Sequence, residues 1–560
     1  MQIASTRKET GWFSVLRGLG AILIAFGLVL SGCDSNGSTN GGDPPPDDGG
    51  NGDTFSVPHY DTSGVDGGAD VITVSDAAED FGVGYEDQDG NAVTEITWSS
   101  DFIYKLDGFV FVEEREELNI DPGTIIKGLP GSGEDASALI VDVGGQIFAD
   151  GNPGSSDPAD AEPIIFTADA DPVTPETAPG GGLGRTTRGE WGGVILLGDA
   201  TINSEPPTTS IEGVPTTEER AIYGAENGDF NDDHNVGVFR FVSIRHTGTV
   251  LGSGSEIQGL TMGGVGSGST IEYVESYASD DDGYEWFGGT VNAKYLISAW
   301  VSDDAFDLDE GFRGSNQFAL AVYATDIGGR AAEHDGGTDP ESGEPFATAK
   351  FSNATYIGMG PETRDDDVGG DGNNPFLVHR DNNATSYFHS VFMDARITEA
   401  GLQIEDLESG EDSRERWLAD ELRHENNFWF NIGPDWAPDD STTFESIIQL
   451  TTDDDGNPVG DGGEAFRGEL ADYLRDNGNQ LLSTSPIQSI DRSGDGVINS
   501  LDPTAAGPAA GTNPQAPSGF GETGGENSQF TPVNDNGAVT QQTGKWYEGW
   551  TLLSQDGVLQ

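Results

Sequence analysis

Short runs of alternating apolar and polar residues recur along the chain, separated by Gly, Asn and Asp, and helical periodicity is scarce. Successive runs are 32, 22, 23, 33 and 36 residues apart, which indicates a base repeat of 22–23 residues lengthened by loop insertions. A repeat this short, built from strands and glycine turns, predicts an all-β solenoid, the parallel β-helix. The runs align on six aromatic anchors: Phe241, Tyr273, Tyr295, Phe318, Phe351 and Tyr387.

Two segments depart from this strand pattern. Residues Arg414–Asn427 follow a potential cap at Asp412 and Ser413, which favours a helix. In Phe466–Asp476 apolar residues recur at i, i+4, i+7 and i+8, and Asn477-Gly478 follows, so a second helix is predicted there. We expect both helices in an insertion or cap on the end of the solenoid.

The charge balance excludes several classes of protein. The 560 residues include 98 acidic and 25 basic side chains, a formal net charge of −73. A field this negative repels phosphate backbones, so nucleic acid is excluded as a partner. The single Cys excludes a disulfide scaffold and a Cys-based zinc site, and 34% apolar residues are enough for a folded core.

The acidic residues are spread over the whole chain, a pattern that resembles halophilic adaptation. At roughly 1 M salt the Debye length is about 3 Å, which screens the self-repulsion of such a surface. We therefore expect the protein to melt at a higher temperature in concentrated NaCl or KCl than in dilute buffer. Equal melting temperatures in the two solutions would contradict this expectation.

The N-terminal residues predict export. Basic residues precede an apolar run, Leu19–Leu30, that is too short to span a bilayer but suits a signal peptide. The run ends Leu30-Ser31-Gly32-Cys33, which resembles a bacterial lipoprotein lipobox and implies cleavage before Cys33 and lipidation of that residue. An ordinary secretory signal is the alternative.

Composition and repeats divide the chain into six segments. We expect an anchor in the outer membrane with the protein on the cell surface; Asp34, directly after the lipidated Cys, leaves the inner membrane open. The predicted segments are a signal peptide (1–32), a lipid-anchored flexible linker (33–53), an N-terminal cap (54–95), the β-helix (96–406), an insertion or cap with two helices and a calcium-like loop (407–530), and a C-terminal segment packed on the β-helix (531–560).

Several stretches together resemble a family of surface lipoproteins, largely without assigned function, from the Bacteroidota and their relatives. Residues 120–128 (IDPGTIIKG) and 144–151 (GGQIFADG) are similar to the opening coils of bacterial right-handed parallel β-helix proteins. Residues 189–203 (GEWGGVILLGDATIN), 302–312 (SDDAFDLDEGF) and 545–553 (KWYEGWTLL) are more specific to the lipoprotein family. The resemblance implies a right-handed parallel β-helix and an exported lipoprotein, and it implies no settled activity.

One acidic cluster is singled out by its spacing. Ser279-Asp280-Asp281 and Ser302-Asp303-Asp304 lie 23 residues apart, one predicted repeat, so their carboxylates should stack on one face of the solenoid. Stacked carboxylates must bind a cation, share a proton or be screened by salt. The candidate face contains Asp280, Asp281, Asp282, Glu285, Asp303, Asp304, Asp307, Asp309 and Arg313.

Three interpretations of this face remain open: structural acidic turns, a cation site such as calcium, and an acid–base pair that cleaves polysaccharide. β-Helix pectate lyases combine Asp-bound calcium with a basic residue, and Arg313 and Lys294 are the nearby cations in the sequence. The sequence has the Asp-Asp pair of β-helix glycosidases but lacks their Gly-His-Gly and Arg-x-Lys motifs. Catalytic residues are therefore left unassigned.

A second candidate is a loop that resembles the calcium loops of dockerin and EF-hand repeats. Residues 491–502 fit the 12-residue template, with Gly496 at position 6. The match departs from those repeats because there is one loop rather than two, and because Pro503 prevents an exiting helix directly after it. The predicted calcium ligands are Asp491, Ser493, Asp495, the Val497 carbonyl, Asn499 and Asp502.

These observations favour a binding or structural role at the cell surface over catalysis, with carbohydrate, a cation or an outer-membrane protein as the partner. A polysaccharide lyase or glycoside hydrolase at the acidic face is one alternative, and an accessory lipoprotein of a nutrient-uptake receptor is another. We expect the aromatic residues that could form a sugar-stacking platform to belong to the core instead; they are Trp191, Tyr284, Trp286, Phe287 and Trp300.

Overall fold

The chain divides by its internal contacts into two units, Met1–Thr54 and Phe55–Gln560, and the second contains every residue described below. The predicted signal peptide, Cys33 and the linker lie outside the described residues. The computed structural model describes residues 61–75, 83–86, 92–252, 255–337, 340–361, 363, 375–396, 399–408, 410–433, 436, 442–453, 456–493, 496–514 and 530–560.

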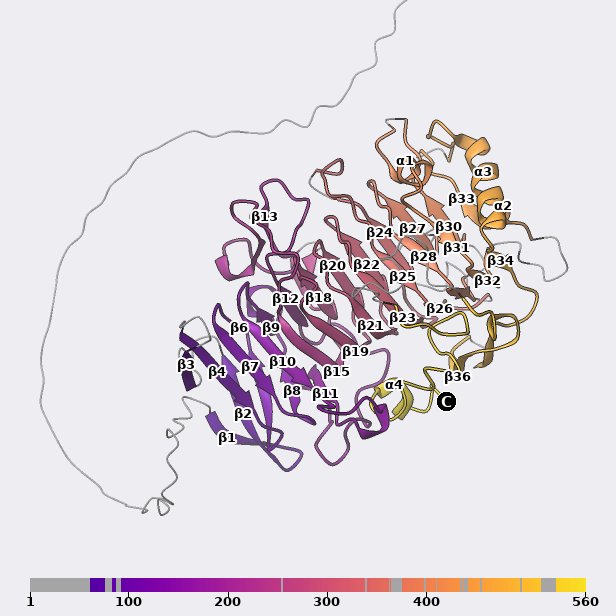
Figure 1. Cartoon of the computed structure of the whole chain (residues 1–560). Coiled ribbons are helices and arrows are strands. Elements are labelled where there is room, and N and C mark those ends of the chain that lie inside the picture. Colours follow the sequence, from indigo (N-terminus) through magenta and orange to yellow (C-terminus); the bar gives the residue numbers. More distant parts are fainter. Residues whose placement is uncertain are drawn as a thin grey trace, which may run out of the picture. The chain divides into compact units, whose positions relative to one another are not determined.

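The second unit is built from two long sheets whose strands pair mainly in parallel (Figure 1). The first sheet contains β1 (Asp61–Asp66), β2 (Ala69–Ser75), β3 (Val83–Glu86), β4 (Ala92–Trp98), β5 (Phe102–Asp107), β7 (Glu116–Ile120), β8 (Ile125–Gly128), β10 (Gln146–Asp150), β11 (Ile164–Ala168), β15 (Gly237–Arg245), β19 (Thr270–Tyr277), β21 (Ala293–Ala299), β23 (Ser315–Val322), β25 (Lys350–Ser352), β26 (Thr355–Ile357), β28 (Ser386–Phe388), β29 (Val391–Met393), β31 (His424–Glu425), β32 (Phe428–Phe430) and β34 (Gln480–Leu481).

The second sheet has ten strands and carries the site described below. Its strands are β6 (Phe109–Val112), β9 (Ala138–Val141), β12 (Val194–Leu197), β18 (Leu260–Gly263), β20 (Tyr284–Phe287), β22 (Phe306–Asp309), β24 (Ala332–Asp335), β27 (Leu377–Arg380), β30 (Leu402–Ile404) and β33 (Ile448–Gln449). The other strands of the described residues form the hairpins β13 (Thr208–Ser210) with β14 (Ile222–Gly224), β16 (Val250–Gly252) with β17 (Ser255–Glu256) and β35 (Ile487–Arg492) with β36 (Ile498–Ala505), and the α-helices described are α1 (Ser413–Leu418), α2 (Phe444–Ile447), α3 (Gly463–Asp476) and α4 (Leu552–Gln555).

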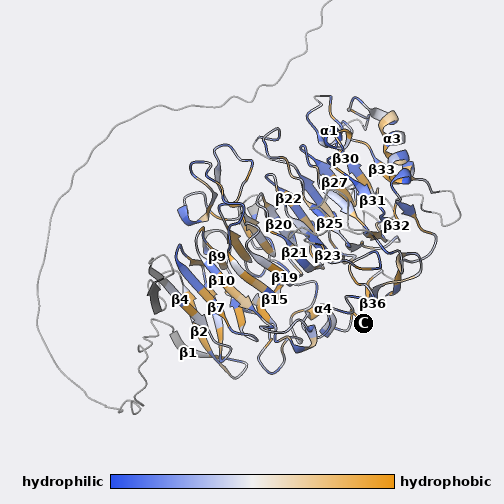
Figure 2. Ribbon diagram, in the orientation of Figure 1, coloured by the Kyte–Doolittle hydropathy of each residue, from blue (hydrophilic) through white to orange (hydrophobic). Residues whose placement is uncertain are grey.

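The chain winds from one sheet to the other and back, so each coil stacks on the next. Strands β28, β29 and β30 of one coil pair in parallel with β31, β32 and β33 of the following coil. Side chains that alternate inward fill a continuous core, and Figure 2 shows β15 dominated by apolar residues while β22 and β27 are more hydrophilic. The predicted all-β parallel β-helix is confirmed.

The long strands of the middle coils bend at an aromatic residue with a positive φ angle. These residues are four of the predicted anchors, Phe241 (51°), Tyr273 (54°), Tyr295 (60°) and Phe318 (63°). Their ring centroids lie 4.3, 4.2 and 4.9 Å apart in chain order, so the rings form one stack. Stacking offsets the strain of the left-handed backbone, which ordinary side chains avoid.

The two later anchors were assigned incorrectly. The bend continues through Asn353 (φ 57°) and His389 (φ 52°), two residues after the predicted Phe351 and Tyr387. Asn tolerates the left-handed conformation better than a bulky side chain does, so an aromatic residue is not needed there. Phe351 and Tyr387 instead stack on each other in the main core, with ring centroids 5.1 Å apart.

Parallel pairing extends beyond the predicted limits of the β-helix at residues 96 and 406. It begins where β2 pairs with β5 and ends where β32 pairs with β34. The first predicted helix ends at Leu418 rather than Asn427, because Asp420 takes a φ of 62° and the chain then returns to the sheet as β31. The second forms as α3, which ends at Asp476 as expected. Within the described residues, no helix has the length and apolar character needed to cross a bilayer.

The C-terminal segment returns to the middle coils and packs on the aromatic stack. Trp546 and Trp550 both contact Tyr273 edge-on, at centroid distances of 6.4 Å. At the start of α4, the backbone N–H groups of Leu552 and Leu553 donate hydrogen bonds to the buried carboxylate of Glu275, at 2.8 and 3.0 Å. This contact joins residues 277 positions apart in the sequence.

Candidate functional site

A row of outward-facing acidic side chains crosses three neighbouring strands of the second sheet. Glu285 on β20 is paired in register with Asp307 on β22, and Asp307 is paired with Glu333 on β24. Each acid alternates with inward core residues, such as Tyr284 and Phe306 beside the first pair. Because adjacent parallel strands are about 4.8 Å apart, the register places these carboxylates side by side.

The turns that precede β20 and β22 add a second group of carboxylates. Asp304 N donates a hydrogen bond to Asp282 Oδ1 at 2.8 Å, and Gly283 N donates to Asp304 O at 2.9 Å. Asp282 therefore stacks on Asp304, an offset of 22 residues, and the predicted offset of 23 was one residue too long. Asp280 is paired with Ser302, whose Oγ donates to Asp280 Oδ1 at 3.2 Å.

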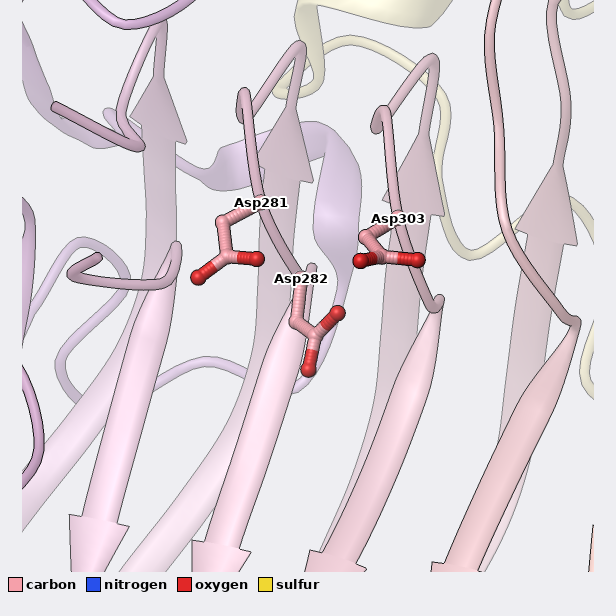
Figure 3. A group of neighbouring side chains, drawn as sticks. All are labelled: Asp281, Asp282 and Asp303. Atoms are coloured by element: carbon pink, nitrogen blue, oxygen red, sulfur yellow. The ribbon is translucent and has the colours of Figure 1, made fainter. Parts of the chain in front are cut away.

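The acids of these two groups, apart from Asp280, line one pocket of about 340 Å³. Figure 3 shows the carboxylates of Asp281, Asp282 and Asp303 on neighbouring loops directed toward the same space. Among the described lining residues there is no Lys, Arg, His, Cys or aromatic residue. The lining residues are Glu212, Glu256, Gln258, Asp281, Asp282, Glu285, Asp303, Asp304, Asp307 and Glu333.

Two sets of three carboxylates in this pocket are close enough to hold a metal ion. The outer triad is Asp281, Asp282 and Asp303, and the inner triad is Asp282, Glu285 and Asp307. Within each triad one oxygen per residue lies within 4.8 Å of the others. Asp303 is exposed, whereas Asp282 and Glu285 are only 7% and 5% exposed.

The pocket holds more carboxylates than it can keep ionised without compensation. Burial, together with the charges of Glu256 and Asp303, raises the pKa of Asp281 to about 8. Burial and neighbouring acids also raise the pKa values of Asp282, Glu285 and Asp307 well above their ordinary range. Within the described part of the chain, no group donates a hydrogen bond to Glu285 Oε2 or Asp307 Oδ1, although both atoms are buried.

The far end of the pocket combines an acid whose pKa is raised with one whose pKa is lowered. Burial, then the charge of Glu333 and a hydrogen bond to it, raises the pKa of Asp304 well above its ordinary value. Burial alone would raise the pKa of Glu333, but the hydrogen bond from Asp304 and the charges of Arg330 and Arg380 lower it. Both guanidinium groups form ion pairs with Glu333.

The cations predicted from the sequence do not line this pocket. Arg313 forms an ion pair with Asp232 at 3.1 Å, and Lys294 donates a hydrogen bond to Thr531 Oγ1 at 3.1 Å. Arg313 follows β22, lies past the acidic row and is not among the residues that line the pocket. Asp309 is also outside the pocket lining, and its Oδ1 accepts a hydrogen bond from Glu310 N at 2.6 Å.

The spacing of the acidic pairs did not identify Glu333, Arg330 and Arg380. These residues lie beyond the two repeats that contain the acidic pairs. The distance from Asp307 to Glu333 in the sequence is longer than the base repeat, because a loop precedes β24. Glu212 and Glu256 were also missed, because Glu212 lies in a turn and Glu256 in the short hairpin strand β17, outside the repeat that was used. The alternating pattern of β24, with Glu333 and Asp335 facing outward around His334, is the signal that could have identified the row.

The aromatic residues considered as a sugar-stacking platform are all buried, as expected for core residues. Trp191, Tyr284 and Trp286 have no exposed surface, and Phe287 and Trp300 are 6% and 1% exposed. The hydroxyl group of Tyr284 donates a hydrogen bond to the Val274 carbonyl inside the core.

The predicted calcium loop lies across the hairpin of β35 and β36. The Val497 carbonyl accepts hydrogen bonds from Ser493 N and Ser493 Oγ, at 2.8 and 3.2 Å. Asp502 forms an ion pair with Lys545 at 3.2 Å, and Asn499 Nδ2 donates to Asp491 Oδ2 at 3.5 Å. Asp495 lies outside the described residues. These contacts occupy several of the expected ligand groups, and calcium binding at this loop stays a prediction.

Comparison with known proteins supports the fold-level interpretation. No curated protein and no solved structure matches the chain. Residues 90–372, half of the chain, match a family described as a pectate-lyase-like beta helix domain. With the stacked parallel sheets described above, this match shows that the chain belongs to the pectate-lyase-like β-helix family.

Proposed function

We propose that this chain is a cell-surface β-helix protein that binds calcium in its acidic pocket and, through the calcium, an extracellular polysaccharide. The observation that carries the proposal is Glu285, which is 5% exposed, faces the pocket and has an Oε2 atom with no hydrogen-bond donor among the described residues. A buried carboxylate without a partner is costly unless a proton or a cation compensates it.

The chemistry of the lining favours calcium over other metal ions. Calcium takes six to eight oxygen ligands in flexible geometry, and nine of the ten lining residues supply carboxylates. Zinc and copper prefer nitrogen or sulfur ligands, and no described lining residue is His or Cys. Magnesium demands a tighter octahedron and retains several waters, which suits this wide ring of carboxylates less well.

A polysaccharide is the ligand class that fits the location. The Leu30–Cys33 motif supports a lipid anchor that would place the pocket outside the cell, and the charge of −73 supports a salty medium. Bound calcium would turn a pocket that repels acidic sugars into one that coordinates their oxygen atoms. If a Cys33→Ser chain still fractionated with membranes, the anchor would be contradicted.

Calcium binding is tested on the full chain, purified in detergent and freed of metal with a chelator. In about 1 M NaCl, which screens non-specific counterion binding, calcium should raise the melting temperature and give a saturable binding isotherm. Asp282→Asn should remove the part of both effects that arises in the pocket, because Asp282 belongs to both triads. Asp101→Asn, an exposed acid outside the pocket, is the matched control and should behave like the unmodified chain.

A second candidate function is the cleavage of polysaccharide. It is favoured by the pairing of Asp304, whose pKa is raised, with Glu333, whose pKa is lowered, since glycosidases combine an acid and a base with pKa values shifted apart in this way. A depolymerisation screen in high salt, with and without calcium, distinguishes the two functions. New reducing ends or unsaturated products that disappear in Asp304→Asn would favour the enzyme, whereas calcium-dependent glycan retention without products would favour the binding protein.

A further inference from the structure

The two carboxylate triads share one residue, and they differ in their exposure. Asp282 lies between an outer triad that includes the exposed Asp303 and an inner triad that includes the buried Glu285. In each triad the candidate oxygens lie within 4.8 Å of one another. Two oxygens bound to one calcium at about 2.4 Å can be no more than about 4.8 Å apart, so both triads satisfy this geometric condition.

The carboxylate of Asp282 has the capacity to serve two ions. An ionised carboxylate has about four lone-pair positions, and the hydrogen bond from Asp304 N to Asp282 Oδ1 uses one of them. The remaining positions allow each triad to draw on Asp282. Carboxylate-bridged metal ions in two-metal sites are typically about 3.5–4 Å apart, a separation that a single shared side chain can span.

If the carboxylates of both triads are ionised, their charge calls for more than one divalent cation. The two triads contain five carboxylates, Asp281, Asp282, Glu285, Asp303 and Asp307. One divalent ion would leave three of these negative charges uncompensated next to further acids of the lining. Two divalent ions would leave one negative charge uncompensated. Burial favours this smaller residual charge, because a buried charge without a partner is costly.

The inner triad contains the two buried oxygens that lack a hydrogen-bond donor, and the outer triad faces solvent. Glu285 Oε2 and Asp307 Oδ1 are buried and receive no hydrogen bond from the described residues, so an ion there would satisfy atoms that protein groups do not. At the outer triad, the exposed Asp303 leaves room for ligands from outside the protein.

From this geometry we propose a two-cation centre in which Asp282 bridges an inner calcium, held by Glu285 and Asp307, and an outer calcium, held by Asp281 and Asp303. The inner ion completes the buried row of acids, and the outer ion retains coordination positions for oxygen atoms of the glycan. This inference rests on the proposed calcium-binding function and specifies how that function is carried out.

The test counts calcium bound to the full chain by equilibrium dialysis and atomic emission, in about 1 M NaCl. Counts are compared with those of Asp282→Asn, so that any ion bound elsewhere, including the loop at residues 491–502, cancels. The unmodified chain and the control Asp101→Asn should each bind two more ions than Asp282→Asn. Asp303→Asn and Asp307→Asn should each lose one ion, and only Asp303→Asn should retain the tighter, inner one.

The possible outcomes separate the inference from the function on which it rests. A difference of one ion between the unmodified chain and Asp282→Asn would overturn the two-cation centre and leave the calcium-binding function intact. A difference of zero would overturn both. If Asp307→Asn does not fold, the unmodified chain and the exposed Asp303→Asn decide the question, and an Asp303→Asn chain that keeps both ions would overturn the inference.

Discussion

Replacing Glu275 by alanine is expected to lower the free energy of unfolding by about 3–5 kcal/mol. The Glu275 carboxylate is fully buried and accepts hydrogen bonds from Ser243 Oγ at 2.6 Å and from the N–H groups of Leu552 and Leu553. Ser243 Oγ in turn accepts a hydrogen bond from Nε of the buried Arg245 at 2.8 Å. Alanine would leave two backbone donors without an acceptor and a buried guanidinium without its nearby carboxylate.

Chemical denaturation of the full chain in high salt measures this effect. Glu272→Ala is the matched control, because Glu272 lies on the same strand β19 but its side chain is 36% exposed. A surface change of this kind should alter the unfolding free energy by about 0.5 kcal/mol or less. Similar denaturation midpoints for the two variants would contradict the importance of the Glu275 network.

The apparent calcium affinity is expected to rise roughly 100-fold between pH 6 and pH 9. The pKa of Asp281 is raised to about 8, so its side chain is almost entirely protonated at pH 6 and mostly ionised at pH 9. A proton must leave before the carboxylate can bind the cation, and the two therefore compete. Isothermal titration across this range measures the slope, and an affinity that is constant from pH 6 to pH 9 would contradict the prediction.

The same pKa shift predicts how stability depends on pH when no cation is present. Asp281 binds its proton more tightly in the folded state, at a pKa of about 8, than in the unfolded state, near its ordinary 3.8. Its contribution to stability is therefore lost as the pH rises through this window. Calcium should restore the loss at pH 8, and Asp281→Asn should flatten both the affinity profile and the stability profile.

The fold could be predicted from the sequence because a β-helix repeats the same local pattern in every coil. The spacing of Phe241, Tyr273, Tyr295 and Phe318 identified the solenoid, and the structure shows that the strands bend at these residues and that their rings stack. The pattern failed at Phe351, because Asn353 forms the bend without an aromatic ring. The spacing of the aromatic residues along the sequence gives the length of each coil, but it does not show where within the coil a loop has gained or lost a residue.

The site could be predicted only in part for the same reason. Seven of the nine residues proposed for the acidic face line the pocket or border it through Asp280, while Arg313 and Asp309 do not line it. Because the predicted stacking offset was one residue too long, it paired Asp304 with Asp281, whereas in the structure Asp304 pairs with Asp282. Glu333 comes from the coil after β22 and Arg380 from the coil after that, and the strand register shows that Glu333 meets the acids of β20 and β22.

The return of α4 to Glu275 also has a consequence for the order of folding. Coils of a solenoid can form from neighbour contacts alone, whereas this contact closes 277 positions of chain. Until the distant segment docks, the Glu275 carboxylate lacks two of its donors and the aromatic stack lacks the cover of Trp546 and Trp550. We therefore expect an intermediate in which the coils are stacked but the C-terminal segment has not yet docked. The docking of this segment should then limit the rate of the final folding step.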